Sequence, residues 1–324
     1  MRKWFQAGFS AIALSISAVA MAASGSWPEH PLTLVVPFGP GSSPDQMARV
    51  ITEQASKTLG QPIVVQNRPG ASGNLGTGVI AKSKPDGYTF GVSITGPMVN
   101  NTLIYKDLSY DPKKDLIPLT LAVHQPNILV VPANSPIKTV AQLLDAMRDP
   151  KSQYNFPSTG TGTVAHLAVE LLLQRVGGKA VHVPYASSPA ALSALLSGDA
   201  QFAALPPVAV MPMVNDGRLR ALAVVFNEKT DMFPNIPTLA EEGVKGIEGS
   251  GWIGFVAPAG LPDDIRKKLT DALVSAIHDP TVEKRLKAQY MLPVGGTSEA
   301  FAQYMDEELK RWGPIIKRLN LSVN

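Results

Sequence analysis

Short apolar runs alternate along the chain with longer segments in which apolar residues recur every three or four positions. In Asp45–Leu59 this spacing places Met47 and Val50 on one face of a helix, and Val164–Val176 shows the same pattern. Runs of strand length occupy Leu32–Phe38, Ile63–Gln66, Tyr88–Ile94, Asn127–Val131, Asn155–Phe156, Ala180–Pro184, Gln201–Leu205, Leu219–Val225 and Trp252–Val256. The alternation predicts an α/β protein with mostly parallel, doubly wound sheets.

The last quarter of the chain is mainly helical in pattern. Helical spacing covers Pro262–Asp279, Thr281–Ala288 and Ser298–Leu319, with a strand signal near Leu292–Val294. Another helix is expected to begin with Ser188 as its N-cap and to stop at Gly198. Because no internal repeat or Gly/Ser-rich linker divides the chain, two lobes would be joined by short crossings near Val123–Pro126 and Val225–Glu228.

The N-terminus has the features of a secretory signal peptide. Arg2 and Lys3 precede an uncharged stretch from Phe9 to Val19, and the small-residue site Ala20-Met21-Ala22 follows it. This stretch is shorter than the roughly 20 apolar residues that a membrane-spanning helix needs. We therefore expect export to the periplasm and cleavage after Ala22.

Composition narrows the function classes. The 324 residues are 45% hydrophobic, which is enough for large apolar cores, and only 17% are charged. Removal of residues 1–22 takes away two basic residues and leaves 27 against 26 acidic ones, a balance that does not suit a nucleic-acid partner. The chain has no cysteine, which excludes disulfides and thiolate chemistry.

The common catalytic and cofactor motifs are absent or broken. The five histidines show no metal-ligand spacing, so no metal site is expected. Gly41-Ser42-Ser43-Pro44 lacks the closing glycine of a nucleophile elbow. Gly39-Pro40-Gly41 matches only part of a dinucleotide fingerprint, and we expect no cofactor. His166, at the start of a helix, could contact a ligand or make a structural hydrogen bond.

Loops rich in glycine and hydroxyl side chains connect several predicted strands to helices. They are Phe38–Asp45, Ser158–Thr163 and Tyr185–Ser188. Backbone N–H groups at helix N-termini suit an anion, and ligands of open α/β sheets bind where such loops gather. Tight turns and helix caps explain any single loop equally well. The four hydroxyls within Ser158–Thr163 exceed what a turn needs and favour a binding site.

The order of several short motifs resembles one family across essentially the whole mature chain. They are Pro31–Phe38 with Gly39-Pro40-Gly41, Gln66–Asn74, Lys84–Tyr88, Ser158-Thr159-Gly160, His166-Leu167-Ala168, His182–Tyr185, Gly217–Leu222, Pro234–Thr238 and Ala257–Gly260. In this order they are similar to the Bug-type extracytoplasmic solute receptors, the substrate-binding proteins of tripartite tricarboxylate transporters.

The resemblance implies a type II periplasmic-binding-protein fold, in which two α/β lobes close like a Venus flytrap on a ligand cleft. It divides the chain into a signal peptide (1–22), a discontinuous first lobe (23–124 and 228–324) and a second lobe (125–227). The positions that it implies for ligand binding are Phe38, Gly41, Ser42, Ser43, Asp45, Ser158, Thr159, Gly160, Thr161, Gly162, Thr163, His166, Tyr185, Ser187, Ser188 and Leu205.

Two departures from the family pattern bear on the ligand. Relatives often have Gly-Gly-Thr-Asp where this chain has Ser42-Ser43-Pro44-Asp45, so the contact from that threonine hydroxyl is lost. Many relatives also carry an aspartate where this chain has Leu205-Pro206-Pro207. An apolar wall there cannot pair with an ammonium group, which predicts a carboxylate with an apolar or aromatic far end, such as an aromatic mono- or dicarboxylate, rather than an amino acid.

The sequence thus predicts a periplasmic, monomeric, non-catalytic receptor that captures a small organic carboxylate and delivers it to a membrane transporter of the tripartite tricarboxylate type. Two other interpretations stay open at this point. One is an exported enzyme that uses His166 or His182 as a general base in the same cleft. The other is a ligand-loaded partner of a sensor protein.

Overall fold

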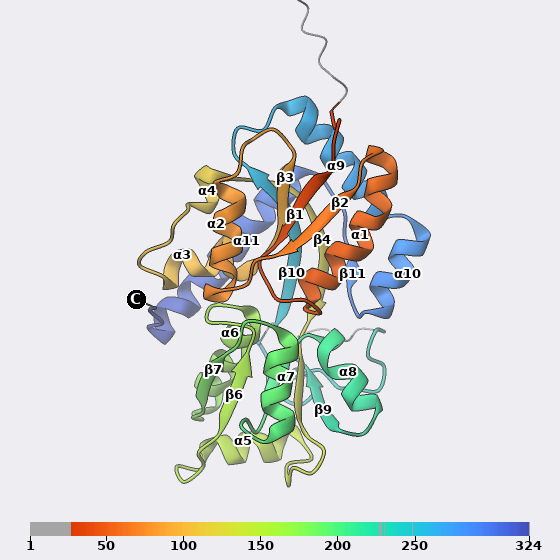
Figure 1. Ribbon diagram of the computed structural model, residues 1–324. Coiled ribbons are helices and arrows are strands. Elements are labelled where there is room, and N and C mark those ends of the chain that lie inside the picture. Colours follow the sequence, from red (N-terminus) through yellow and green to blue (C-terminus); the bar gives the residue numbers. More distant parts are fainter. Residues whose placement is uncertain (1–26, 227–228, 230, 248, 324) are drawn as a thin grey trace, which may run out of the picture.

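The computed structural model describes residues 27–226, 229, 231–247 and 249–323 (Figure 1). The expected signal peptide, with its cleavage site at Ala22, and part of the expected crossing at Val225–Glu228 lie outside these residues. Across the described ranges, no helix has both the length and the apolar character required to cross a membrane.

The chain forms two halves that lie one above the other in Figure 1. The large half contains residues 27–126 and 249–323, and the small half contains residues 127–226 and 231–247. The large half is built on a mixed sheet with the strand order β11-β4-β10-β3-β1-β2. Its strands are β1 (Leu32–Val36), β2 (Ile63–Asn67), β3 (Thr89–Ile94), β4 (Leu116–Pro126), β10 (Ser250–Pro258) and β11 (Leu292–Pro293).

Pairing in the large sheet differs from the mostly parallel arrangement expected from the sequence. β1 pairs in parallel with β2 and β3, but β10 is antiparallel to both β3 and β4. The reason is the path of the chain: β4 leads into the small half and β10 returns from it. An outgoing and a returning strand that lie side by side must run in opposite directions.

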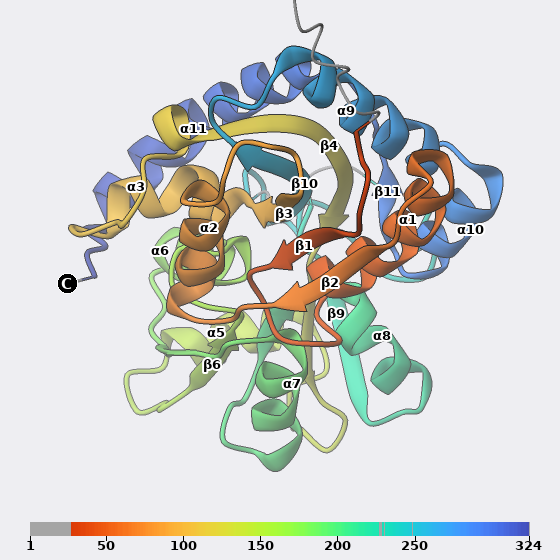
Figure 2. The same cartoon turned by 45° about the horizontal axis from the view of Figure 1, so that its top comes forward.

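Helices cover both faces of the large sheet, as Figure 2 shows. Leu34 and Val36 of β1 face a core formed with α1, α9 and α10, whereas Val35 between them faces α2 and α11. The helices of this half are α1 (Ser43–Leu59), α2 (Asn74–Ala81), α3 (Asn101–Ile104), α4 (Pro112–Asp115), α9 (Asp263–Ile277), α10 (Pro280–Ala288) and α11 (Ser298–Leu319), with a 3-10 turn at Ala71–Gly73 and a π-helical turn at Gly96–Asn100. The alternation along β1 is the period of two that buries both faces of a strand.

The small half has a short antiparallel sheet and a separate parallel pair. β5 (Ile128–Pro132) lies between β8 (Ala203–Leu205) and β9 (Leu219–Val224), and β6 (Asn155–Ser158) pairs with β7 (Val181–Pro184). The surrounding helices are α5 (Val140–Arg148), α6 (Val164–Val176), α7 (Ser188–Ser197) and α8 (Pro207–Asn215). The N-cap of α7 is Ser187 rather than the expected Ser188, because the Ser187 hydroxyl accepts a hydrogen bond from the Ala190 N–H.

Two chain segments cross between the halves side by side. The Asn127 N–H donates to the Gly249 carbonyl at 3.0 Å, and the Asn127 carbonyl accepts from the Val225 N–H at 2.8 Å. The Gly249 N–H in turn donates to the Val225 carbonyl at 2.8 Å. The first crossing therefore lies at Asn127, immediately after the expected Val123–Pro126.

The C-terminal helix α11 packs on both halves. Its Trp312 and Ile316 form an apolar cluster with Ile104 of the large half and with Val164 and Leu167 of the small half. Trp312 is 2% exposed, and its indole N–H donates to the Glu308 carboxylate at 3.1 Å. This cluster is an apolar contact between the two halves that is separate from their chain crossings.

Replacement of Trp312 tests the contribution of this cluster. Trp312→Ala removes a buried aromatic ring and leaves a cavity, so we expect the free energy of unfolding to fall by about 3–5 kcal/mol. Urea unfolding followed by circular dichroism measures this change. Lys317→Ala, at an exposed position of the same helix, is the control and should change it by less than about 0.5 kcal/mol. Equal effects of the two substitutions would contradict the proposed contribution of the cluster.

Candidate functional site

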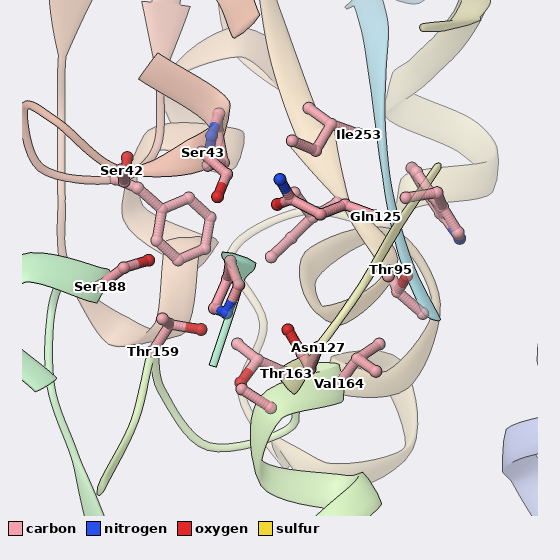
Figure 3. Close-up of a pocket in the computed structure, with 17 residues that line it drawn as sticks. Ser42, Ser43, Thr95, Gln125, Asn127, Thr159, Thr163, Val164, Ser188 and Ile253 are labelled. Atoms are coloured by element: carbon pink, nitrogen blue, oxygen red, sulfur yellow. The ribbon is translucent and has the colours of Figure 1, made fainter. Parts of the chain in front are cut away.

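A cavity of about 520 Å³, including solvent at its mouth, lies between the two halves (Figure 3). The residues that line it come from the first turns of helices, from the ends of β3 and β4, and from the start of β10. They are Phe38, Ser42, Ser43, Pro44, Ile94, Thr95, Gln125, Asn127, Thr159, Thr163, Val164, Ala165, Ser188, Pro206, Gly251, Trp252 and Ile253.

Four helices begin at this cavity. Ser43 opens α1, Val164 opens α6, Ser188 opens α7, and Pro206 immediately precedes α8. The partial positive charges at these N-termini therefore meet in one space. No acidic or basic side chain is among the lining residues. Helix dipoles and backbone N–H groups are thus the main electrostatic feature of the site, and they favour an anion.

Hydroxyl groups gather on one side of the cavity. In Figure 3 the side chains of Ser43, Thr159 and Ser188 surround the same space. The hydroxyls of Ser42 and Ser43 are buried, and neither has a hydrogen-bond partner among the described residues. A buried hydroxyl without a partner is costly, so an acceptor or donor brought by a ligand would stabilise this side of the site.

The opposite side of the cavity is mainly apolar. Val164 and Ile253 lie across from the serines in Figure 3, and Ile94 and Trp252 also line the cavity. The buried Thr95 hydroxyl lies on this side as well, and Thr163 adjoins Val164. The cavity is therefore polar at one end and largely apolar at the other.

Two amide side chains lie between these ends. Gln125 is the second-last residue of β4, and Asn127 is the residue at which the chain crosses between the halves. Both are nearly fully buried, with exposed fractions of 5% and 4%. A ligand in the cavity would consequently contact the crossing segment as well as the loops of each half.

The loop between β1 and α1 is held by Asp45. Its carboxylate accepts hydrogen bonds from the Gly41 N–H at 2.9 Å, from Asn67 at 2.9 Å and from Arg49 at 3.1 Å. Burial raises the pKa of Asp45, but the hydrogen bonds from Arg49, Gly41 and Asn67 outweigh it and lower the pKa below its ordinary value. The charged carboxylate is thus used inside the loop and does not line the cavity.

The loop between β6 and α6 touches the large half. The Asn100 side-chain amide donates to the Gly162 carbonyl at 2.9 Å, and Gly160 lies directly against Ser72. Gly39 of the large half likewise lies against Ser187 of the small half. Glycine allows this close approach, because a Cβ atom at position 160 would lie 2.6 Å from the Ser72 hydroxyl oxygen.

A second hollow of about 610 Å³ adjoins the cavity. It shares Phe38 and Thr159 with the cavity, and Gly160, Thr161 and Tyr185 also line it. Phe38 therefore stands between the two spaces. The aromatic wall expected from Phe38 stays a prediction, and its side chain is placed to contact a ligand in either space.

The structure separates the residues expected to bind a ligand into two groups. Those that line the main cavity are Phe38, Ser42, Ser43, Thr159, Thr163 and Ser188. Those that do not are Gly41, Asp45, Ser158, Gly160, Thr161, Gly162, His166, Tyr185, Ser187 and Leu205. Most of the second group shapes the loops: Ser187 caps α7, for example, and Leu205 ends β8 just before Pro206.

Sequence reasoning missed the lining residues that lie in strands or, like Thr95, directly follow one. Thr95, Gln125, Trp252 and Ile253 are not part of glycine-rich loops, and only the expected crossing near Val123–Pro126 pointed to one of them. In a two-lobed protein, the chain segments that cross between the lobes pass the ligand cleft. This general rule would have identified Gln125, within the expected crossing, as a candidate ligand-binding residue.

The two histidines that the alternative enzyme interpretation would use as general bases do not line the cavity. His166 and His182 are absent from its lining. Burial, followed by the neighbouring His166, lowers the pKa of His182 from 6.5 to about 3. Among the residues that the structure describes, no cluster of three or more His, Cys, Asp or Glu side chains is arranged to hold a metal ion.

Comparisons with known proteins agree on one group. The sequence profile of the tripartite tricarboxylate transporter family receptors matches residues 47–321. Protein BugT of Bordetella pertussis is 32% identical over 295 residues, which are 90% of each chain. The periplasmic binding protein BugD superposes with a TM-score of 0.86 at 26% identity, and an R. palustris protein with adipate superposes with 0.88 at 30%. Both alignments cover 92% of this chain and all of the other. The expected periplasmic-binding-protein fold is confirmed.

Substitution at Gly160 tests the contact that this residue makes with Ser72 of the large half. Gly160→Ala introduces a Cβ atom that clashes with Ser72, and its φ of +129° adds backbone strain. We expect the halves to move apart, which small-angle X-ray scattering detects as a larger radius of gyration. Gly198→Ala is the matched control, since Gly198 also has a positive φ but no atom lies within 4 Å of its added Cβ. An unchanged radius of gyration for Gly160→Ala would contradict this interpretation.

Proposed function

Because this chain belongs to the family of tripartite tricarboxylate transporter receptors, we propose that it captures a small organic carboxylate in the cavity between its halves and delivers it to a membrane transporter. Members of this family are solute-binding receptors rather than enzymes. The observation that carries the proposal is the meeting of four helix N-termini at a buried cavity whose lining bears hydroxyls and no charged side chain. Such a site attracts an anion without binding it through a fixed positive charge.

The two ends of the cavity favour a carboxylate with an apolar body. The carboxylate would accept hydrogen bonds on the side of Ser42, Ser43 and Thr159, and the rest of the ligand would lie against Val164 and Ile253. No acidic side chain lines the cavity, so an ammonium group would be buried without a counter-charge. We therefore infer an aromatic or aliphatic mono- or dicarboxylate. The R. palustris relative with adipate fits this class.

The proposed receptor works by closure of its halves. A ligand that touches the helix N-termini of both halves binds the closed arrangement better and shifts the population toward it. We place the lobe boundaries at the crossings, near residues 124–127 and 225–249. We further propose that the chain acts in the periplasm as a monomer after removal of residues 1–22.

A panel of acids measured on the chain that begins at Ala23 tests the ligand class. Benzoate, terephthalate and adipate should raise the melting temperature and give measurable heats of binding in calorimetry, whereas aspartate and glutamate should give neither. The reason is the absence of a partner for the ammonium group. Tight binding of aspartate or glutamate, with no response to the other acids, would overturn the proposed class.

Substitution of a cavity serine tests the site itself. Ser43→Ala removes a buried hydroxyl from the polar end, so we expect the dissociation constant for the best acid of the panel to rise about 10- to 150-fold, as loss of a hydrogen bond to a charged group predicts. Ser193→Ala, at an exposed position of α7, should leave it unchanged. Calorimetry measures both values, and equal affinities for the two variants would place the carboxylate elsewhere.

A further inference from the structure

The cavity contains a buried hydroxyl that lies away from the serines. Thr95 is 1% exposed, and its hydroxyl has no hydrogen-bond partner among the described residues. It directly follows β3 and lines the cavity on the same side as Val164 and Ile253. A buried hydroxyl without a partner destabilises the protein that carries it. A ligand group that pairs with Thr95 would offset this cost.

Two amide side chains have unused hydrogen-bonding capacity in the same cavity. The Asn127 side chain makes no hydrogen bond to a described residue. The Gln125 side-chain N–H donates to the Gln289 carbonyl at 3.4 Å, which leaves the Gln125 amide oxygen without a partner among the described residues. In Figure 3 both side chains extend into the cavity between Thr95 and the serines. They can therefore pair with a ligand together with Thr95.

The register of the large sheet brings these groups to one place. β10 lies between β3 and β4. Ile253 of β10 pairs with Ile94 of β3, and Thr95 is the next residue after Ile94. On the other side of β10, Gly251 pairs with Gln125. Thr95 and Gln125 thus flank the start of β10, and Gly251 has no side chain that would fill the cavity between them.

The hydrogen-bonding groups on this side suit a hydroxyl better than a second carboxylate. A hydroxyl both donates and accepts, so it can donate to the Gln125 amide oxygen and accept from Thr95 or from the Asn127 amide. A carboxylate only accepts, and its negative charge would face the Gln125 oxygen. None of the described residues that line the cavity is basic, so no side chain would offset that charge.

We propose that Thr95, Gln125 and Asn127 form a second binding subsite, which takes an uncharged hydroxyl at the end of the ligand remote from its carboxylate. The preferred ligand is then a hydroxycarboxylate in which an apolar body separates the two polar groups. This inference rests on the proposed function, because it names the ligand class of the same cavity.

Matched acids test the second subsite by calorimetry on the chain that begins at Ala23. Para-hydroxybenzoate carries an uncharged hydroxyl opposite its carboxylate at neutral pH, ortho-hydroxybenzoate carries it beside the carboxylate, and benzoate has none. Two ordinary hydrogen bonds predict that para-hydroxybenzoate binds about 5- to 150-fold more tightly than benzoate. Ortho-hydroxybenzoate should show no such gain, since its hydroxyl cannot reach Thr95 when its carboxylate lies beside the serines.

Two further comparisons define the charge and the body of the ligand. Terephthalate replaces the hydroxyl by a second carboxylate and should bind less tightly than para-hydroxybenzoate. Hexanoate, omega-hydroxyhexanoate and adipate repeat the series with a flexible aliphatic body. We expect the same order, with the hydroxy acid as the tightest ligand of the three.

Variants of the subsite connect this preference to its residues. Thr95→Val keeps the shape of the side chain and removes the hydroxyl, and Gln125→Met removes the amide. Each should lower the ratio of the affinities for para-hydroxybenzoate and benzoate by about 3- to 10-fold, because one hydrogen bond is lost. The affinity for benzoate itself should change little. Since the Thr95 hydroxyl has no partner in the protein, the ligand-free Thr95→Val variant should melt at the wild-type temperature or above it.

Thr270 provides the matched control. Its hydroxyl on α9 is also buried without a partner among the described residues, but Thr270 does not line the cavity. Thr270→Val should therefore keep the wild-type ratio of affinities.

The possible outcomes separate this inference from the proposed function. Equal affinities for para-hydroxybenzoate and benzoate, or an unchanged ratio in Thr95→Val and Gln125→Met, would overturn the second subsite and leave the proposed function in place. Tighter binding of terephthalate and adipate than of the hydroxy acids would overturn the uncharged character of the second group. A lower melting temperature of ligand-free Thr95→Val would assign its hydroxyl to the fold instead. Failure of every acid to bind would overturn both proposals.

Discussion

The structure depends most on the two chain crossings that are hydrogen-bonded to each other at Asn127, Val225 and Gly249. Since the outgoing and returning segments are adjacent, β4 and β10 must pair antiparallel in the middle of the large sheet. This pairing brings Gln125, at the end of β4, next to the first residues of β10 and forms the floor of the cavity. The helix N-termini of both halves then meet above that floor.

Local sequence signals predicted part of the helices: α1, α6, α7, α9, α10 and α11 were expected, whereas α2, α3, α4, α5 and α8 were not. The apolar spacing in α6 and α11 gave both helices with the bounds that the structure has, because amphipathic periodicity extends over many residues and tolerates single exceptions. The long strand β4 was missed. It contains Pro118 beside a β-bulge and polar residues such as Thr120, which interrupt the period of two that identifies a strand.

The candidate site was only partly predictable for a related reason. Ser42, Ser43 and Thr159 belong to glycine- and hydroxyl-rich loops, whose composition marks them in the sequence. Thr95 follows β3 and Trp252 lies in β10, and these two strands pair although they are distant along the chain. No local sequence pattern predicts that pairing. Conversely, His166 belongs to a recognisable motif, but its side chain contacts the backbone of the 158–163 loop at Gly162 and does not line the cavity. The direction of a side chain at the start of a helix depends on the packing around it, which the motif does not contain.

The discontinuous composition of the large half has a consequence for the order in which the protein assembles. β3 is complete early in the chain, yet its partner β10 pairs Ile253 with Ile94, and α11 covers the sheet only when the last residues are present. Contacts between such distant residues form slowly because a long loop must close first. The N-terminal third therefore cannot complete its own core during synthesis. If the chain is exported as proposed, this delay would keep the precursor unfolded, which is the state that a translocation channel accepts.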